Sequence, residues 1–164
     1  MSATLKVNAV RNPAMDDTPR QRRICVFVEL LERGKMTAPQ VTAAHEIARV
    51  FQAITAGLGV RVQDYQPRIR SGRNGEDWHV SLRNAYTDRY IPWRAWAGSI
   101  QIKHSATIAD IVIAMATGNA GLRQMADAYR MDQRTVLTVV RNGLHEYAKI
   151  AGWVDEFGKP ISVS

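Results

Sequence analysis

The chain has 164 residues, of which 46% are apolar, and it carries 22 Lys and Arg against 15 Asp and Glu, for a net charge of +7. This apolar share excludes a wholly disordered protein, and the length suits one domain with a single buried core. The basic balance favours a polyanionic partner such as nucleic acid, because a positive surface attracts phosphates and releases their counterions on binding.

The single cysteine, Cys25, excludes an internal disulfide and indicates a reducing compartment. No apolar run reaches the ~18 residues that a membrane span requires, and the N-terminus lacks the apolar stretch of a signal peptide. We therefore expect a cytoplasmic protein that does not contact membranes.

Two helices are predicted in the first third of the chain. Residues 1–17 lack helical periodicity and contain breaker pairs, which indicates a flexible N-terminal arm. After this arm, helix start signals and apolar stripes predict one helix over 19–33 and a second over 38–56. We expect both to pack as an antiparallel pair in the core of a single helical domain, 18–164.

Residues 60–104 are predicted to be a basic, irregular segment of this domain. Gly, Pro and Asn interrupt the segment, so we expect a short β-hairpin, with strands over 60–70 and 77–83 and the turn SGRNGED, or irregular backbone. A basic loop of this kind can bind the phosphates of DNA, and its arginines are Arg68, Arg70 and Arg73. A solvated loop with incidental charge is the equal alternative.

Four aromatic residues alternate with arginines later in the same segment. These residues are Tyr86, Tyr90, Trp93 and Trp96. Rings in such a setting can stack the bases of a single nucleic-acid strand. They more often form core, and a core role is the interpretation that we favour.

Residues 105–152 are predicted to form a trihelical helix-turn-helix. A helix over 107–116 precedes the stretch LRQMADAYRMDQRTVLTVVRNGL, residues 122–144, which breaks at Met131-Asp132 and then resumes. Ala126 is small enough for two helices to approach, and Asp132 is placed to cap the second helix. The residues expected to share a small core are Leu122, Met125, Tyr129, Met131, Val136, Val139 and Val140. Beyond residue 152, Trp153 and Phe157 are expected to pack back on the body.

The remaining face of the second helix carries side chains suited to reading DNA. Gln, Arg and Asn present donors and acceptors that match base edges in the major groove, and Leu can contact a thymine methyl. The predicted base-reading residues are Gln133, Arg134, Leu137, Thr138, Arg141 and Asn142. Alternatively, Leu137 packs in the hydrophobic core and does not contact DNA. Arg123 and Thr135 are predicted to bind phosphate, together with the arginine loop.

The stretch LRQMADAYRMDQRTVLTVVRNGLHEYAKIAG resembles the helix-turn-helix of bacterial sigma factor region four and of response-regulator output domains. The shared features are an apolar-x-x-apolar-Ala pattern, a short turn and a Thr-Val step into the second helix. Arg130 stands where that family usually has glycine, so the turn requires a non-glycine residue in the left-handed conformation, at a cost of about 1 kcal/mol or more.

The order of parts is also similar to the helix-turn-helix domain of alphaproteobacterial gene transfer agent activators. There, a helix like MTAPQVTAAHEIARVFQAI precedes a basic, irregular middle and a final helical pair. Together the resemblances imply a regulator of transcription, bacterial or phage-related, that binds double-stranded DNA.

Two other classes of function stay open. An adaptor that contacts RNA polymerase or another protein, without reading DNA, predicts that Leu137 lies in an exposed apolar patch. A small nuclease requires carboxylates to converge on a metal, and the candidates are Asp64, Glu76, Asp77 and Asp88. The histidines are not spaced as metal ligands and the single cysteine supplies no zinc site, so we expect neither a metal nor another cofactor. The sequence also lacks the motif of a nucleophilic Ser or Cys, so we do not expect an enzyme. The sequence has no sustained heptad repeat, so it does not predict an oligomeric state.

Overall fold

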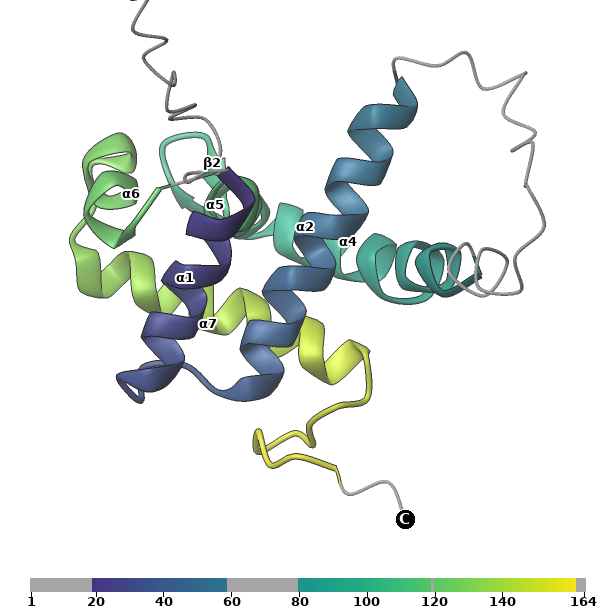
Figure 1. The fold of residues 1–164 in the computed structure, drawn as a ribbon. Coiled ribbons are helices and arrows are strands. Elements are labelled where there is room, and N and C mark those ends of the chain that lie inside the picture. The colour runs from purple at the N-terminus through teal and green to yellow at the C-terminus, as the bar shows by residue number, and fades with distance from the viewer. Residues whose placement is uncertain (1–18, 59–79, 119, 162–164) are drawn as a thin grey trace, which may run out of the picture.

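The computed structural model describes residues 19–58, 80–118 and 120–161, which are helical over most of their length (Figure 1). The elements in chain order are α1 (Pro19–Glu32), α2 (Ala38–Leu58), the π-helical turn η1 (Ala85–Tyr90), α4 (Ile91–Ser99), β1 (Gln101–Lys103), β2 (Ala106–Thr107), α5 (Ile108–Thr117), α6 (Leu122–Tyr129) and α7 (Gln133–Ile150). The two strands pair antiparallel. The protein is therefore mainly α with a short hairpin, as the sequence predicts.

Helices α1 and α2 begin and end where local signals place them. Gly34, with φ of +67°, follows the last turn of α1 and adopts the left-handed conformation that glycine takes at low cost. Thr37 precedes α2, and its backbone N–H donates to Gln40 Oε1 at 3.0 Å, as in a capping box. The helices contact each other and run in opposite directions in Figure 1, so this pair is confirmed.

Residues 80–99 are helical throughout, which corrects the predicted strand over 77–83 in its described part. Tyr90 and Trp93 lie one helical turn apart and are both buried, and the Trp93 indole N–H donates to the Gly143 carbonyl at 2.8 Å. Burial of this face against α7 holds the segment as a helix. The predicted core role is confirmed for these two rings, whereas Tyr86 is 39% exposed.

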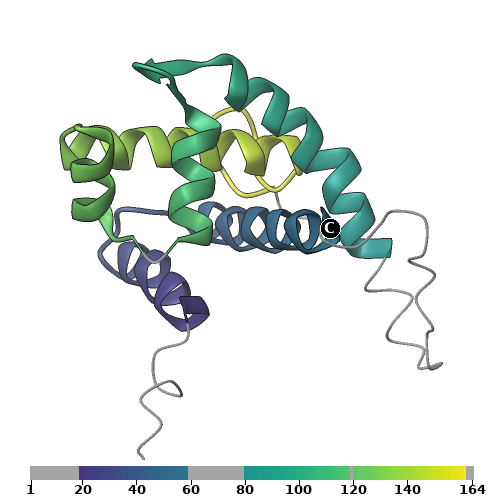
Figure 2. The ribbon, with the colours of Figure 1, turned by 90° about the horizontal axis from the view of Figure 1, so that it is seen from above.

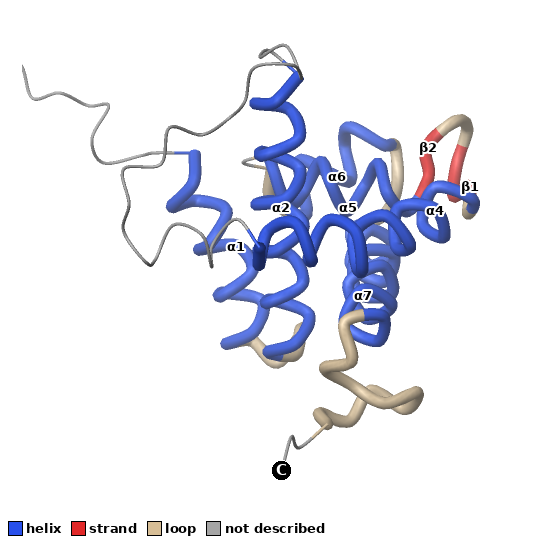
Figure 3. Tube along the Cα trace, turned by 90° about the vertical axis from the view of Figure 1, so that its right-hand side faces the viewer, coloured by secondary structure: helices blue, strands red, loops and turns tan. Residues whose placement is uncertain are grey.

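The hairpin lies later in the chain than the sequence predicts. Strands β1 and β2 follow α4 directly and project at the edge of the helical body in Figure 3. The predicted strand over 60–70 and the turn SGRNGED lie outside the described residues. The N-terminal arm, 1–17, also lies outside them.

Helix α7 is the centre of the described fold. It contacts α2, α4, α5, α6 and η1, and Figure 2 shows it crossing α5 and running alongside α2. Its buried face carries Val136, Val139, Val140, Gly143, Leu144, Tyr147 and Ala148. At Gly143 an added Cβ would lie only 2.6 Å from Val112 Cγ2, so α5 approaches α7 closely at this point.

A polar network ties the second half of α7 to its neighbours. The Tyr147 hydroxyl donates to Glu46 Oε1 at 2.7 Å, and Arg89 Nη1 donates to the same oxygen at 2.9 Å. The Arg89 guanidinium also lies 5.5 Å from the ring centroid of Trp153. Burial, followed by the hydrogen bond to Glu46, raises the pKa of Tyr147, so its phenol stays protonated. The network joins α2, η1, α7 and the C-terminal tail.

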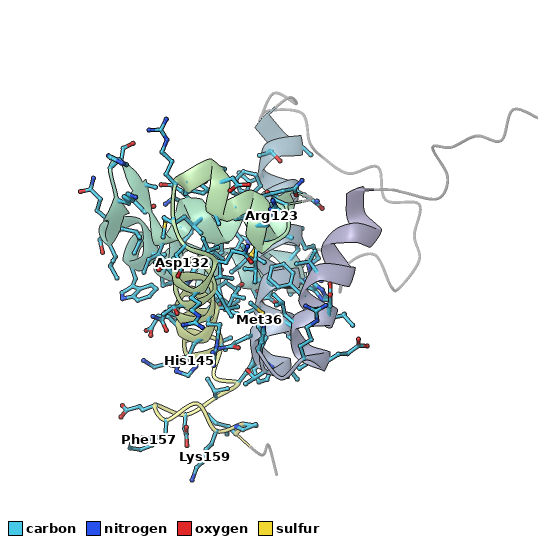
Figure 4. The ribbon with its side chains drawn as sticks, turned by 90° about the vertical axis from the view of Figure 1, so that its left-hand side faces the viewer. Met36, Arg123, Asp132, His145, Phe157 and Lys159 are labelled. Carbon is cyan, nitrogen blue, oxygen red and sulfur yellow. The ribbon has the colours of Figure 1, made fainter. Side chains whose placement is uncertain are left out.

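The tail after α7 only partly follows the prediction. Trp153 packs against the core, but Phe157 is 88% exposed, so its predicted packing is wrong (Figure 4). The Asp155 carboxylate accepts hydrogen bonds from the Phe157 and Lys159 backbone N–H groups, at 2.9 and 2.8 Å. This turn directs Phe157 into solvent and leaves Val154 as the buried apolar residue of the tail.

Candidate nucleic-acid interface

Helices α6 and α7 are joined by a turn that contains no glycine. Arg130 has φ 50° and ψ 50°, which is left-handed, and the Met131 backbone N–H donates to the Ala126 carbonyl at 2.9 Å. The predicted left-handed arginine is therefore confirmed, with its conformational cost of about 1 kcal/mol or more. The turn sets α6 steeply across the line of α7 in Figure 2.

The interior of this helical pair matches its prediction. The buried members are Met125, Ala126, Val136, Val139 and Val140. The partly buried members that pack against them are Leu122, Tyr129 and Met131. The small side chain of Ala126 permits the close approach of α6 and α7, which are in contact.

The start of α7 differs from the prediction in one detail. Asp132 has the extended backbone of an N-cap residue, and its carbonyl accepts from the Val136 N–H at 3.0 Å, but its side chain forms no capping hydrogen bond. The carboxylate is exposed to water, which solvates it in place of the free helix amides. Its negative charge still interacts favourably with the positive end of the helix dipole.

The first ten residues of α7 present a polar, exposed surface. Of the predicted base-reading residues, five are exposed, namely Gln133, Arg134, Thr138, Arg141 and Asn142. Leu137 is only partly exposed and packs against the core, which agrees with its alternative role. The Thr138 hydroxyl donates to the Arg134 carbonyl at 2.9 Å and so retains its oxygen as an acceptor.

The predicted phosphate ligands divide into two groups. Arg123, on the first turn of α6, and Thr135, on the first turn of α7, are both exposed. Figure 4 shows Arg123 and Asp132 on the same side of the molecule, Arg123 near the start of α6 and Asp132 beyond its other end, at the start of α7. Arg68, Arg70 and Arg73 lie outside the described residues.

The carboxylates of the nuclease alternative are mostly outside the described residues too, namely Asp64, Glu76 and Asp77. Asp88 is exposed on η1, where it accepts a hydrogen bond from the Thr87 hydroxyl at 3.0 Å. Within the ranges that the structure describes, no group of three His, Cys, Asp or Glu gathers where a metal ion could bind.

A cleft beside the helical pair was not anticipated from the sequence. It has a volume of about 520 Å³ and is lined by residues of the hairpin, α5 and the end of α6, among them Lys103, His104, Asp110, Tyr129 and Arg130. The Lys103 ammonium donates to the Arg130 carbonyl. The only sequence signal for this site is the basic pair Lys103-His104 between two short apolar stretches, which carries little weight without the fold.

The charges of this region are predominantly positive. Between residues 101 and 142 there are five Lys and Arg side chains, all exposed, and three Asp. One of these, Asp110, accepts hydrogen bonds from the Thr107 backbone N–H and hydroxyl, at 2.9 and 2.7 Å. These bonds lower the pKa of Asp110 and hold its carboxylate at the start of α5. An anionic ligand therefore meets a net positive surface.

Comparison with known proteins identifies no relative of this chain. No protein-family model, no curated protein and no solved structure matches the chain. Among the described helices, none combines the length and the apolar composition that crossing a membrane requires. The interpretation of α6 and α7 as a helix-turn-helix accordingly comes from the sequence and geometry of this chain.

Proposed function

We propose that this protein is a transcriptional regulator that binds double-stranded DNA, with the first turns of α7 in the major groove. The observation that carries the proposal is the division of α7 between residues 133 and 142, where one face is buried in the core and the other is polar and exposed. The major groove of B-DNA, about 12 Å wide, admits a helix, and its base edges offer the hydrogen-bond pattern that such a face can read.

Each exposed side chain has a role in this proposal. Arg134 and Arg141 donate to guanine, and Gln133 and Asn142 form paired hydrogen bonds with adenine. The Thr138 hydroxyl, which donates its hydrogen to the Arg134 carbonyl, accepts a hydrogen bond from the base. Arg123 and Thr135 bind phosphates and so fix the position of the helix on the duplex without selecting sequence.

The packing of Leu137 favours DNA over a protein partner at this surface. An adaptor requires an apolar patch on the exposed face of α7, but Leu137 packs against the core instead. The exposed large apolar residues of the described chain lie on other elements, and they are Val80, Tyr86, Ile91, Phe157 and Ile161. If the protein shows no sequence preference for DNA, an adaptor that contacts RNA polymerase becomes the favoured function. A role in bacterial or phage-related transcription follows from the resemblances of residues 122–152 and of the order of parts.

The test compares specific and unspecific binding by fluorescence anisotropy. Duplexes enriched from a random pool by the wild-type protein are titrated with wild type, with Arg134→Ala/Arg141→Ala, and with a control, Arg83→Ala/Lys159→Ala. The control also removes two positive charges, but from exposed positions away from the helical pair. Residues 80–84 lie at the opposite end of the molecule from α6 in Figure 1, and Lys159 lies on the tail in Figure 4.

The wild type is expected to prefer enriched over scrambled duplexes, and the control variant to keep that preference. Two lost base contacts, at about 1 to 3 kcal/mol each, reduce the preference of the double variant by roughly 30-fold or more. If all three proteins bind every duplex alike with a steep salt dependence, α7 does not read bases and the proposal is wrong.

A further inference from the structure

The β1–β2 hairpin is bonded to the turn of the helical pair. The Lys103 ammonium donates to the Arg130 carbonyl, which joins two residues 27 positions apart in the chain. At the tip of the hairpin, the Gln101 side-chain amide donates to the His104 carbonyl. The tip is thereby fixed beside the turn, and the cleft of about 520 Å³ lies between the hairpin and the end of α6.

Two strained residues line this cleft. Among the described residues, His104 and Arg130 are the non-glycine residues with positive φ, at 53° and 50°. Glycine adopts such a φ with little strain, but both positions hold side chains with N–H donors. Strained backbone of this kind concentrates at ligand sites, where the surrounding structure holds it. Here both strained residues lie in one cleft, together with the ammonium of Lys103.

We propose that the hairpin, together with the turn beside it, is a second phosphate-binding element, in which Lys103 and His104 of the hairpin and Arg130 of the turn contact the backbone of the same DNA that α7 reads. This inference rests on the proposed function. It adds a contact outside the helical pair and assigns a role to the outer side of the hairpin, where Gln101, Lys103 and His104 are exposed, whereas Ile102 packs against the core.

The arrangement places cations on both sides of the start of α7. In Figure 4 Asp132, which marks that start, lies between Arg123 on one side and the hairpin on the other. A helix in the major groove is flanked by the phosphates of two strands, so this spacing suits one strand at Arg123 and the other at the hairpin.

The donors of the cleft are available to a phosphate. An ammonium has three N–H donors, and Lys103 uses one of them on the Arg130 carbonyl. The acid of the cleft, Asp110, is occupied by Thr107, and it also lies 4.0 Å from Arg94 Nη2. Its charge is thus partly offset where the DNA backbone would approach.

The test uses the variant Lys103→Gln/His104→Gly in the full chain. The glycine removes the imidazole and relieves the positive φ, which offsets the loss of the exposed hydrogen bond from Lys103 to the Arg130 carbonyl, so the double change is expected to leave the melting temperature nearly unchanged. Weaker DNA binding without loss of stability separates a ligand contact from a structural role. If the melting temperature falls, Lys103→Gln alone, which keeps the hairpin backbone as it is, is measured in the same way.

Affinity is measured on the enriched and the scrambled duplexes across a salt series, with Arg83→Ala/Lys159→Ala as control. We expect the hairpin variant to bind both duplexes about fivefold to tenfold more weakly, with the preference retained and the slope of log K against log salt reduced by about 1 to 2. The control removes more formal charge but is expected to change the slope less.

The outcomes distinguish the two proposals. If the wild type shows no preference for enriched duplexes, the proposed function fails first. If the preference is present but the hairpin variant keeps wild-type affinity and slope, the hairpin proposal alone is overturned. The same holds if inorganic phosphate shifts the NMR signals of Lys103 and His104 while duplex affinity is unchanged by the variant, because the cleft then binds free phosphate and not the DNA backbone.

Discussion

A single methyl group at position 143 is expected to force α5 and α7 apart. In Gly143→Ala the new Cβ would lie 2.6 Å from Val112 Cγ2 and 2.9 Å from Ile108 Cγ2, and both distances are shorter than carbon atoms tolerate. Val112 and Ile108 are buried and β-branched, so neither can rotate its methyl group away at low cost. The helix axes must therefore move.

The expected loss follows from two opposing terms. Overpacking a core by one methyl group costs about 1 to 3 kcal/mol, whereas alanine in place of glycine within a helix contributes about 1 kcal/mol of stability. A shift of α7 also lengthens the 2.8 Å hydrogen bond from the Trp93 indole to the Gly143 carbonyl, which is worth about 1 kcal/mol. We expect Gly143→Ala to lower the free energy of unfolding by about 1 to 2 kcal/mol.

Urea unfolding followed by circular dichroism measures this loss, with Gly98→Ala as the matched control. A Cβ at Gly98 also meets an atom at 2.7 Å, but that atom is Arg94 Nη1 at the end of a flexible, exposed side chain. The arginine can move, so Gly98→Ala is expected to be neutral or to gain up to about 1 kcal/mol from helix propensity.

A double variant tests whether the contact with Val112 causes the loss of stability in Gly143→Ala. In a Val112→Ala background the closest methyl is absent, so Gly143→Ala is expected to cost at least about 1 kcal/mol less than in the wild type. Should Gly143→Ala prove as stable as Gly98→Ala, or its cost be the same with and without Val112, the close crossing of α5 and α7 is not what determines stability here.

Two further predictions concern the start of α5 and the tail. Asp110→Asn is expected to cost about 0.5 to 1 kcal/mol at pH 7 by weakening the capping box with Thr107. Because these hydrogen bonds place the pKa of Asp110 below its ordinary 3.8, its contribution is complete above that value and is lost as the pH falls through the lowered pKa. The stability gap between wild type and variant must therefore close below about pH 4, and a gap independent of pH contradicts the assignment. In the tail, Val154→Ala is expected to cost about 1 to 2 kcal/mol since this side chain is buried, whereas Phe157→Ala changes stability by less than about 0.5 kcal/mol. Equal melting temperatures for the two tail variants speak against the packing described.

The parts that the sequence predicts well are those determined by local interactions. The left-handed Arg130 follows from the helix-turn-helix resemblance, because it stands where that family usually has glycine, and Gly34 and Thr37 mark their helix boundaries through backbone preferences alone. The buried stripe of α7 likewise repeats at the helical period, so its exposed face was also predictable.

The helix over 80–99 was missed because its sequence signals conflict. Pro92 is one of the residues that interrupt the sequence pattern of 60–104, but it lies in the first turn of α4, directly after the π-helical turn η1, where its missing N–H is accommodated. The apolar face of the segment 80–99 is formed by aromatic rings that alternate with arginines in the sequence. Tyr90 and Trp93 become core residues only through contact with α7.

The cleft at Lys103 could not be predicted from spacing. The hairpin and the turn meet through a hydrogen bond between residues 27 positions apart, and no local pattern specifies that contact. The same limit applies to Phe157, whose apolar character suggested burial although the Asp155 turn directs it outward.

The continuity of α7 links ligand occupancy to global unfolding. Its first turns are exposed, while Leu144, Tyr147 and Ala148 further along lie in the centre of the core, so the exposed end cannot persist once the body unfolds. A duplex that binds only the folded form then stabilises the whole chain by about 2.7 kcal/mol at one hundred times its dissociation constant. Pools of oligonucleotides can accordingly be ranked by melting temperature, without labelling either molecule.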